Sequence, residues 1–266
     1  MEGLIMGQYM PGNSFLHRLD PRTKFIGSAL LIVTVFLLKG PVQYAVFGAA
    51  VLGLYVLGGV SGSLLRSLRP GIYLVFFTLF LNMIFTPGEI TIIRVGVIRI
   101  TREGVLFGFS MGFRLIFLIS VSSLVSLTTS PVRMTDGLEL LFKPLKKIGF
   151  PSGELAMMMN IALRFIPTFW EETDKIIKAQ ISRGADFNSW NPLSRIKYMT
   201  ALLVPLFLNV FRKSDELALA MEARGYEVGM DRSSLHKLQF NLRDYLILVL
   251  APVLLAVFIL YRSGLN

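Results

Sequence analysis

The chain of 266 residues contains no cysteine, which excludes disulfides, a zinc site built from thiolates and catalysis by a thiol nucleophile. Its two histidines, His17 and His236, lie far apart in polar segments, and we expect both at the solvent or interfacial surface. No glycine is followed by lysine, so a phosphate-binding loop of the Walker A type is excluded. We therefore expect no enzyme activity, and no metal or other cofactor bound by this chain.

Charged residues are scarce as well. They make up 17% of the chain against 53% hydrophobic residues, and the mean hydropathy is +0.62, whereas an ordinary soluble domain has roughly 25% charged residues. The net charge of +10 is found in nucleic-acid-binding proteins, but a membrane protein with many cytoplasmic Lys and Arg residues has the same balance. We predict a lipid bilayer as the surroundings and no nucleic acid as a partner.

Five apolar segments predict membrane-spanning helices, at 25–38, 41–60, 71–86, 105–127 and 245–261. A spanning helix needs roughly 20 residues. The second and fourth segments satisfy this length, whereas the first and third must borrow flanking residues or tilt. None of the five contains a carboxylate, which argues against a proton-coupled pump. The predicted fold class is an all-α integral membrane protein with about five transmembrane helices.

Lysine and arginine set the predicted orientation, because they concentrate in cytoplasmic loops. They are frequent before the first span, in the loop 61–70 and in the long region 131–243. We therefore place the amino terminus and this region in the cytoplasm. The chain then divides into residues 1–130 with transmembrane helices one to four, residues 131–243 as a cytoplasmic module, and residues 244–266 with the final transmembrane helix.

Smaller elements are predicted between the spans. The segment 89–101 is rich in β-branched residues around a central Gly96, which predicts a small external β-hairpin. In the cytoplasmic module, the apolar pattern predicts an amphipathic helix over 131–148 and two long helices over 152–183 and 192–224. We expect the carboxylates of the long helices, such as Glu172, on solvated faces. The stretch 199–211 is too short to be a further span.

The fourth span carries a glycine at every fourth position, at Gly104, Gly108 and Gly112. Such a stripe permits close helix packing within a membrane. It favours packing inside this chain over a docking seam for a second membrane subunit. Arg114 follows on the same helix, and an arginine at that depth usually faces protein or water. It either lines a pathway, snorkels or pairs within the bundle.

One short motif occurs twice, at the ends of the two long helices. Ser182-Arg183-Gly184 and Ala223-Arg224-Gly225 are separated by 41 positions (224 − 183), and the residues before them align at the same offset. A single copy reads as a helix stop, with glycine in a left-handed turn and a cation near the helix carboxyl end. Two copies on matched helices instead favour docking into two grooves of a twofold or pseudo-twofold soluble partner, since arginine presents a planar fork of donors.

Further motifs make the interpretation specific. They are Thr128-Thr129-Ser130-Pro131, Lys143-Pro144-Leu145, Leu163-Arg164-Phe165-Ile166-Pro167, Ala179-Gln180-Ile181-Ser182-Arg183-Gly184 and Ala220-Met221-Glu222-Ala223-Arg224-Gly225. With these, and over nearly its whole length, the chain resembles the transmembrane T component of energy-coupling factor (ECF) transporters, the family that includes the cobalt-transport membrane subunit. The one visible departure is Ser182, where the family has alanine.

The resemblance implies a non-catalytic coupling subunit of an importer in a bacterial or archaeal plasma membrane. Two ATP-binding cassette (ABC) ATPases, as a homo- or heterodimer, bind ATP and Mg²⁺, and the tips at Arg183 and Arg224 of two crossed coupling helices enter grooves on them. A membrane-embedded S component binds a vitamin or metal ion. Met157, Met158 and Met159 are candidates for the surface that holds it, with ordinary core packing as the equal alternative.

Two other functions are weighed against this one. The permease of a conventional ABC transporter, with its own substrate path, predicts one coupling segment in each subunit, and this chain has two. A membrane-embedded enzyme needs acidic or histidine clusters at the bilayer surface, and the sequence shows none.

Overall fold

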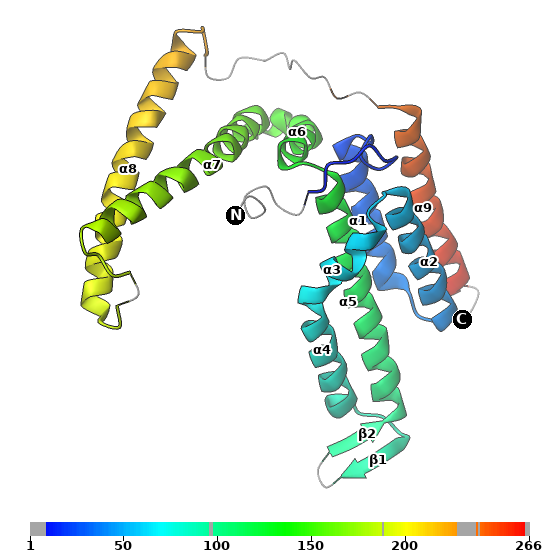
Figure 1. Ribbon diagram of the computed structural model, residues 1–266. Coiled ribbons are helices and arrows are strands. Elements are labelled where there is room, and N and C mark those ends of the chain that lie inside the picture. The colour runs from blue at the N-terminus through cyan, green and yellow to red at the C-terminus, as the bar shows by residue number, and fades with distance from the viewer. Residues whose placement is uncertain (1–8, 96–97, 188, 228–237, 239, 264–266) are drawn as a thin grey trace. The chain divides into compact units, whose positions relative to one another are not determined.

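The computed structural model describes residues 9–95, 98–187, 189–227, 238 and 240–263, and almost all of the regular structure is helical (Figure 1). The all-α fold class is thereby confirmed. The chain forms two compact units, one made of Met6–Leu141 with Leu238–Asn266, the other containing Phe142–Lys237. We call the first the membrane unit and the second the inserted unit. Each is described separately.

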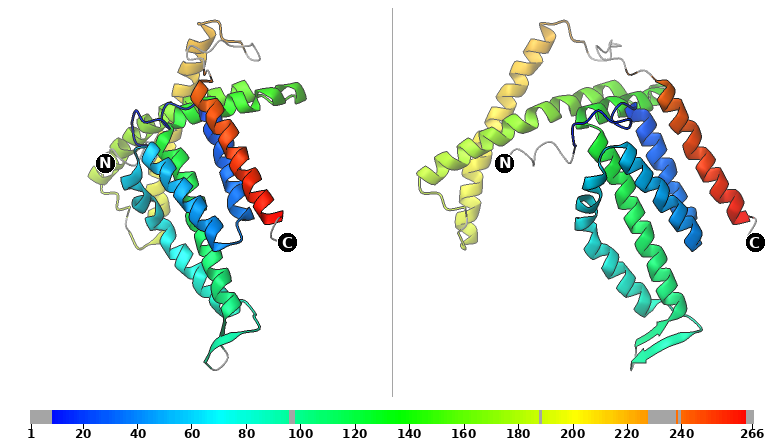
Figure 2. Two further views of the ribbon diagram at one scale, coloured as in Figure 1. Left: turned by 90° about the vertical axis from the view of Figure 1, so that its right-hand side faces the viewer. Right: turned by 45° about the vertical axis from the view of Figure 1, so that its right-hand side comes forward.

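The membrane unit is built around the 27-residue helix α5. Its elements are α1 (Pro21–Leu37), α2 (Pro41–Leu57), η1 (Ser61–Ser63), α3 (Leu64–Leu68), η2 (Arg69–Gly71), α4 (Ile72–Phe85), β1 (Thr91–Val95), β2 (Ile98–Thr101), α5 (Arg102–Thr128), α6 (Pro131–Phe142) and α9 (Leu242–Ser263). Helix α5 packs against α1, α2 and α4, and α9 packs against α1, as Figure 2 shows. Phe47, Val121 and Tyr55 are buried between them, and the Tyr55 hydroxyl donates to the carbonyl of Ser120 (2.9 Å).

Four helical segments among the described residues are long and apolar enough to cross a membrane: Ser61–Phe85, Arg102–Thr128, Pro192–Glu222 and Leu242–Ile259. The third predicted span obtains its length from the helical turns before it. Helices α1 and α2, the first two predicted spans, have 17 residues each. Our length argument against a span at 199–211 is wrong, because that stretch belongs to a helix of 31 residues.

The glycine stripe of α5 faces α4. Gly104, Gly108 and Gly112 are all buried, and a Cβ atom on Gly108 would lie 3.2 Å from the carbonyl oxygen of Leu79. A Cβ atom on Gly104 would lie 3.2 Å from the carbonyl oxygen of Asn82. The two helix backbones therefore approach each other closely along this stripe, as small residues permit.

Arg114 lies within the bundle. One guanidinium nitrogen donates to the carbonyl of Leu38 (3.2 Å), at the carboxyl end of α1. The Tyr44 hydroxyl donates to the same carbonyl (3.2 Å). A cation at a helix carboxyl end is favoured by the unpaired carbonyls there. The arginine thus joins α5 to the turn between α1 and α2.

The predicted small β-hairpin is confirmed. Strands β1 and β2 pair antiparallel, with Arg94 opposite Arg99 and an irregularity between Thr91 and Ile93. Gly96, predicted at its centre, lies outside the described residues.

The expectation for His17 is wrong. Its side chain is only 7% exposed, because one ring nitrogen is hydrogen-bonded to the Ser14 hydroxyl (2.6 Å) and the other donates to the carbonyl of Met10 (2.9 Å). His236 lies outside the described residues.

The inserted unit contains η3 (Lys143–Ile148), α7 (Ser152–Ser182) and α8 (Pro192–Glu222). The predicted amphipathic segment 131–148 forms α6 followed by η3, and it ends at Gly149 with a φ of +87°, a left-handed conformation that glycine adopts readily. Helices α7 and α8 run through Pro167 and Pro205 without interruption.

Candidate partner-docking site

Helices α7 and α8 cross as an antiparallel pair (Figures 1 and 2). Late in α7, the Gln180 amide donates to the carbonyl of Ala201, early in α8 (3.4 Å). Earlier in α7, Glu172 meets Lys213 of the later part of α8. A later residue of α7 therefore contacts an earlier residue of α8, which shows that the two helices run antiparallel.

An ion pair between Glu172 and Lys213 joins the two helices. The Lys213 ammonium is 2.5 Å from Glu172 Oε1, and the two side chains are 25% and 23% exposed. Their separation of 41 positions (213 − 172) equals that of the two arginine motifs. The paired residues therefore correspond to each other in the repeat, and the two antiparallel helices meet at them.

Glu172 was expected on a solvated face, and this expectation is wrong. One of its carboxylate oxygens, Oε2, is buried without a hydrogen-bond partner among the described residues. The other oxygen, Oε1, pairs with the Lys213 ammonium, which lies 5.8 Å from the centre of the Phe169 ring. Sequence reasoning missed the pair, although opposite charges at the 41-residue offset were a usable signal.

Both helices end in the same capping geometry. Gly184 and Gly225 have φ values of +85° and +74°. The N–H of Ala185 donates to the carbonyl of Gln180 (2.9 Å), and that of Tyr226 to the carbonyl of Met221 (3.0 Å). With the bonds from each glycine N–H to the carbonyl three residues earlier, these contacts form a Schellman motif at each end. The repeated motif therefore adopts one backbone structure twice.

The antiparallel course of the two helices places the two arginines at opposite ends of the pair. Each follows the ion-paired residue of its own helix by 11 positions (183 − 172 and 224 − 213), which corresponds to about 16 Å of helix. The tips are thus separated by roughly 30 Å. Arg183 and Arg224 are both exposed, and no hydrogen bond or ion pair to a described residue engages either guanidinium.

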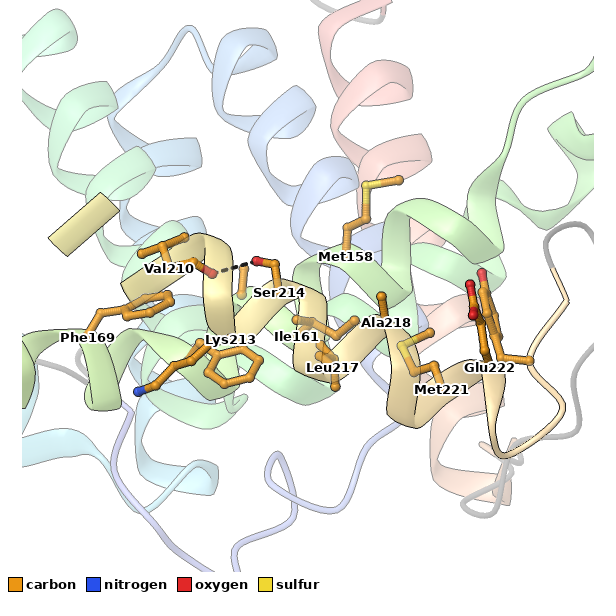
Figure 3. A pocket seen from close by; sticks show the side chains of 13 residues that line it. Met158, Ile161, Phe169, Val210, Lys213, Ser214, Leu217, Ala218, Met221 and Glu222 are labelled. Atoms are coloured by element: carbon orange, nitrogen blue, oxygen red, sulfur yellow. Dashed lines mark hydrogen bonds between the residues drawn. The ribbon is translucent and has the colours of Figure 1, made fainter. Parts of the chain in front are cut away.

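An apolar groove of about 450 Å³ lies between the first half of α7 and the second half of α8. Its walls include Met158, Phe165, Phe169, Leu217 and Met221, and it extends to Tyr226 beside the second arginine tip. Figure 3 shows side chains from both helices along it. Of the predicted methionine surface, Met158 lines this groove, Met159 is exposed and Met157 is half-buried.

A second groove lies at the other end of the pair. It has a volume of about 560 Å³ and is lined by Gln180, Lys197, Thr200, Ala201, Val204 and Pro205. The two ends of the helix pair therefore share a backbone but offer different side chains.

Comparisons with known proteins identify similar sequences. The family model described as "Cobalt transport protein" matches residues 12–235. The chain is 48% identical over 258 residues to the energy-coupling factor transporter transmembrane protein EcfT of Acidaminococcus fermentans, covering 97% of this chain and 95% of that protein. It is 43% identical over 264 residues to EcfT of Bacillus subtilis, covering 99% and 100%.

Proposed function

This chain belongs to the family of transmembrane T components of ECF transporters, and on that premise we propose that it couples an ATPase dimer to a membrane-embedded S component. It is a membrane component of the transporter, and in this proposal it performs no catalysis. ATP and Mg²⁺ are bound by two ABC ATPase subunits, and a vitamin or metal ion is bound by the S component. The choice of substrate then belongs to the S component.

The observation that carries the proposal is the pair of matched arginine tips. Two exposed guanidinium groups at opposite ends of one helix pair can each enter a groove on a different ATPase subunit. A hydrogen bond that involves a charged group contributes about 1.5–3 kcal/mol, so two tips supply a substantial part of the docking free energy. A conventional permease has one coupling segment in each subunit, so it does not account for the second arginine tip.

The apolar groove beside Met158 supports the contact with the S component. Its walls carry methionine and aromatic side chains, and methionine adapts its shape to different partners. The exposed large side chains of α7 and α8 extend this apolar surface and include Ile166, Trp170 and Phe207.

In the proposal, α7 and α8 lie on the cytoplasmic side, as does the amino terminus. Helix α8 has the length and composition of a span, but it also carries Arg212, Lys213, Asp215 and Glu216 in its second half. Four charged residues within five positions are costly inside a hydrocarbon core. The charged half is better placed at the cytoplasmic surface, where the tips can reach soluble ATPases.

The test replaces Arg183 and Arg224 together by glutamate. Carboxylates at both tips repel the acceptors that arginine would bind, so we expect coupled uptake to be abolished in proteoliposomes that hold the complete transporter. Co-purification of the ATPase subunits with the chain measures docking directly.

A matched control changes two exposed cations of the same helices that lie away from the tips, Lys175 and Arg212, to glutamate. This variant has the same net charge and is expected to retain most of the uptake. Normal uptake and normal ATPase binding by the tip variant would refute the assigned role.

A further inference from the structure

A short apolar edge is exposed on η3, at the start of the inserted unit. Because η3 is a 3₁₀ helix, side chains three positions apart lie one above the other. Phe142, Leu145 and Ile148 therefore share one edge, and their side chains are 42%, 39% and 84% exposed. We call residues 142–150 the η3 tip.

A tight turn closes the η3 tip. Gly149 has a φ of +87°. Its N–H donates to the carbonyl of Lys146 (3.0 Å), and the N–H of Phe150 donates to the carbonyl of Leu145 (3.2 Å). The turn brings the Phe150 ring edge-on to the Phe142 ring, with 5.7 Å between the ring centres. The exposed apolar side chains are thus held in a defined arrangement.

Lysines flank the apolar edge on both sides. With three residues in each turn, Lys143 and Lys146 lie on one side of the edge and Lys147 lies on the other. All three are exposed, and residues 140–153 contain no carboxylate. An apolar edge between cations is typical of segments that lie in a membrane interface. There the apolar groups enter the headgroup region, and the long lysine side chains reach the phosphates.

Helix α6 leads to the η3 tip along one end of the membrane helices. The Lys24 ammonium, near the start of α1, donates to the carbonyl of Thr128 at the end of α5 (2.8 Å), so these two helix ends lie at one level. Helix α6 follows α5 and passes the start of α1, where a Cβ atom on Gly137 would lie 2.7 Å from the Cβ atom of Pro21. It therefore runs along these helix ends, and its last residue, Phe142, begins the tip.

We propose that the η3 tip is an interfacial anchor that binds anionic lipid headgroups. Its apolar edge enters the boundary between headgroups and acyl chains, and its lysines bind lipid phosphates. A protein partner would have to supply an apolar surface bordered by carboxylates on both sides. An anionic bilayer presents both features at once, and the chain is already embedded in a bilayer. The inference requires only that the chain is a membrane protein, and it does not depend on the proposed coupling function.

The experiment labels the η3 tip in the full-length chain. Because the sequence contains no cysteine, Ile148→Cys provides a single site for a fluorescent label. The labelled chain is reconstituted into vesicles of phosphatidylcholine alone, or of phosphatidylcholine mixed with phosphatidylglycerol. Acrylamide quenches label that is exposed to water, and a nitroxide on the lipid headgroups quenches label in the interface. The two measurements together give the ratio of embedded to aqueous label.

We expect this ratio to be higher in the vesicles that contain phosphatidylglycerol. There, Lys143→Gln combined with Lys147→Gln should lower it about 25-fold, since each lysine near an anionic surface contributes about fivefold. Added salt should also lower it by screening the charges. The matched control combines Lys175→Gln with Lys197→Gln, two exposed lysines of the long helices, and should leave the ratio unchanged.

The substitutions at the tip replace only exposed side chains, so they remove nothing from a packed core. The anchor is overturned if the ratio is the same in both kinds of vesicle, or if the tip and control variants give equal ratios. It is also overturned if the label becomes shielded from acrylamide only when ATPases or an S component are added, without quenching by the lipid nitroxide, because a protein then covers the tip. Failure of the proposed coupling function would leave the vesicle results unchanged, since they are obtained with this chain alone.

Discussion

Helices α7 and α8 share their length and the structure of their ends, but they differ in the side chains that they carry. Both have 31 residues and an internal proline, and both end in a left-handed glycine after an exposed arginine. Yet the groove near the second tip is lined by methionine and aromatic side chains together with Lys213 and Glu222. The groove at the other end has no methionine or aromatic side chain, and its walls are Gln180, Lys197, Thr200, Ala201, Val204 and Pro205. The similar backbones place an arginine tip at each end of the helix pair. The different side chains allow the two ends to bind different surfaces.

The largest expected effect concerns the first halves of the two helices. Met157-Met158-Met159 of α7 correspond at the 41-residue offset to Tyr198-Met199-Thr200 of α8. Replacing Met158 and Met159 by aspartate puts charge into an apolar surface, and desolvating a carboxylate there is costly. We expect the S component to be lost from the purified complex while the ATPases remain bound.

The counterpart in α8 is the control for that experiment. Met199 is 38% exposed and lines neither of the two described grooves, so Met199→Asp is expected to retain the S component. If the α7 variant keeps a working S component, the methionine surface is not the contact. Loss in both variants would mean that the two helices contribute equally to it.

A smaller effect is expected from the ion pair between Glu172 and Lys213. In Lys213→Met, the partly buried Glu172 carboxylate loses its cation, and its Oε2 atom already lacks a described partner. We expect the free energy of unfolding to fall by about 1–3 kcal/mol, the usual result of leaving a buried polar group unpaired. Thermal or denaturant unfolding in detergent measures the change.

The exposed ion pair of α7 provides the control. Asp174 and Lys178 are 2.6 Å apart, with side chains 55% and 73% exposed, and an ion pair of this kind contributes only about 0.3–0.5 kcal/mol. Lys178→Met should therefore change stability very little. Equal effects in Lys178→Met and Lys213→Met would show that the crossing does not depend on its ion pair.

The smallest effect tests whether the two caps are equivalent. Gly184 and Gly225 have no atom within 4 Å of the position that a Cβ atom would occupy, so alanine at either site costs only the left-handed backbone conformation, about 1 kcal/mol. We expect Gly184→Ala and Gly225→Ala to lower the unfolding temperature by similar amounts. A fall in only one of the two variants would mean that the caps differ in the folded protein.

Much of the fold could be predicted because it depends on local patterns. Apolar periodicity predicted α7 and α8 to within two residues at each end, and β-branched residues predicted the hairpin. The membrane spans were harder to predict from the sequence. Hydropathy does not show that short helical turns extend a span, as they do in Ser61–Phe85. Nor did it show that α8 has the length and composition of a span. The burial of His17 was missed because its partners, Ser14 and Met10, approach it only through the fold of the amino-terminal segment.

By itself, the sequence determined the helices, the two arginine tips and the membrane class, because hydropathy, helix caps and a repeat are properties of neighbouring residues. Only the tertiary structure decided which residues far apart in the sequence contact each other. It brought Asp20 to Asp244, Lys24 to Thr128, and Glu172 to Lys213. Such pairs form when packed helices bring distant side chains within hydrogen-bonding distance, and no local pattern specifies which distant partner that will be.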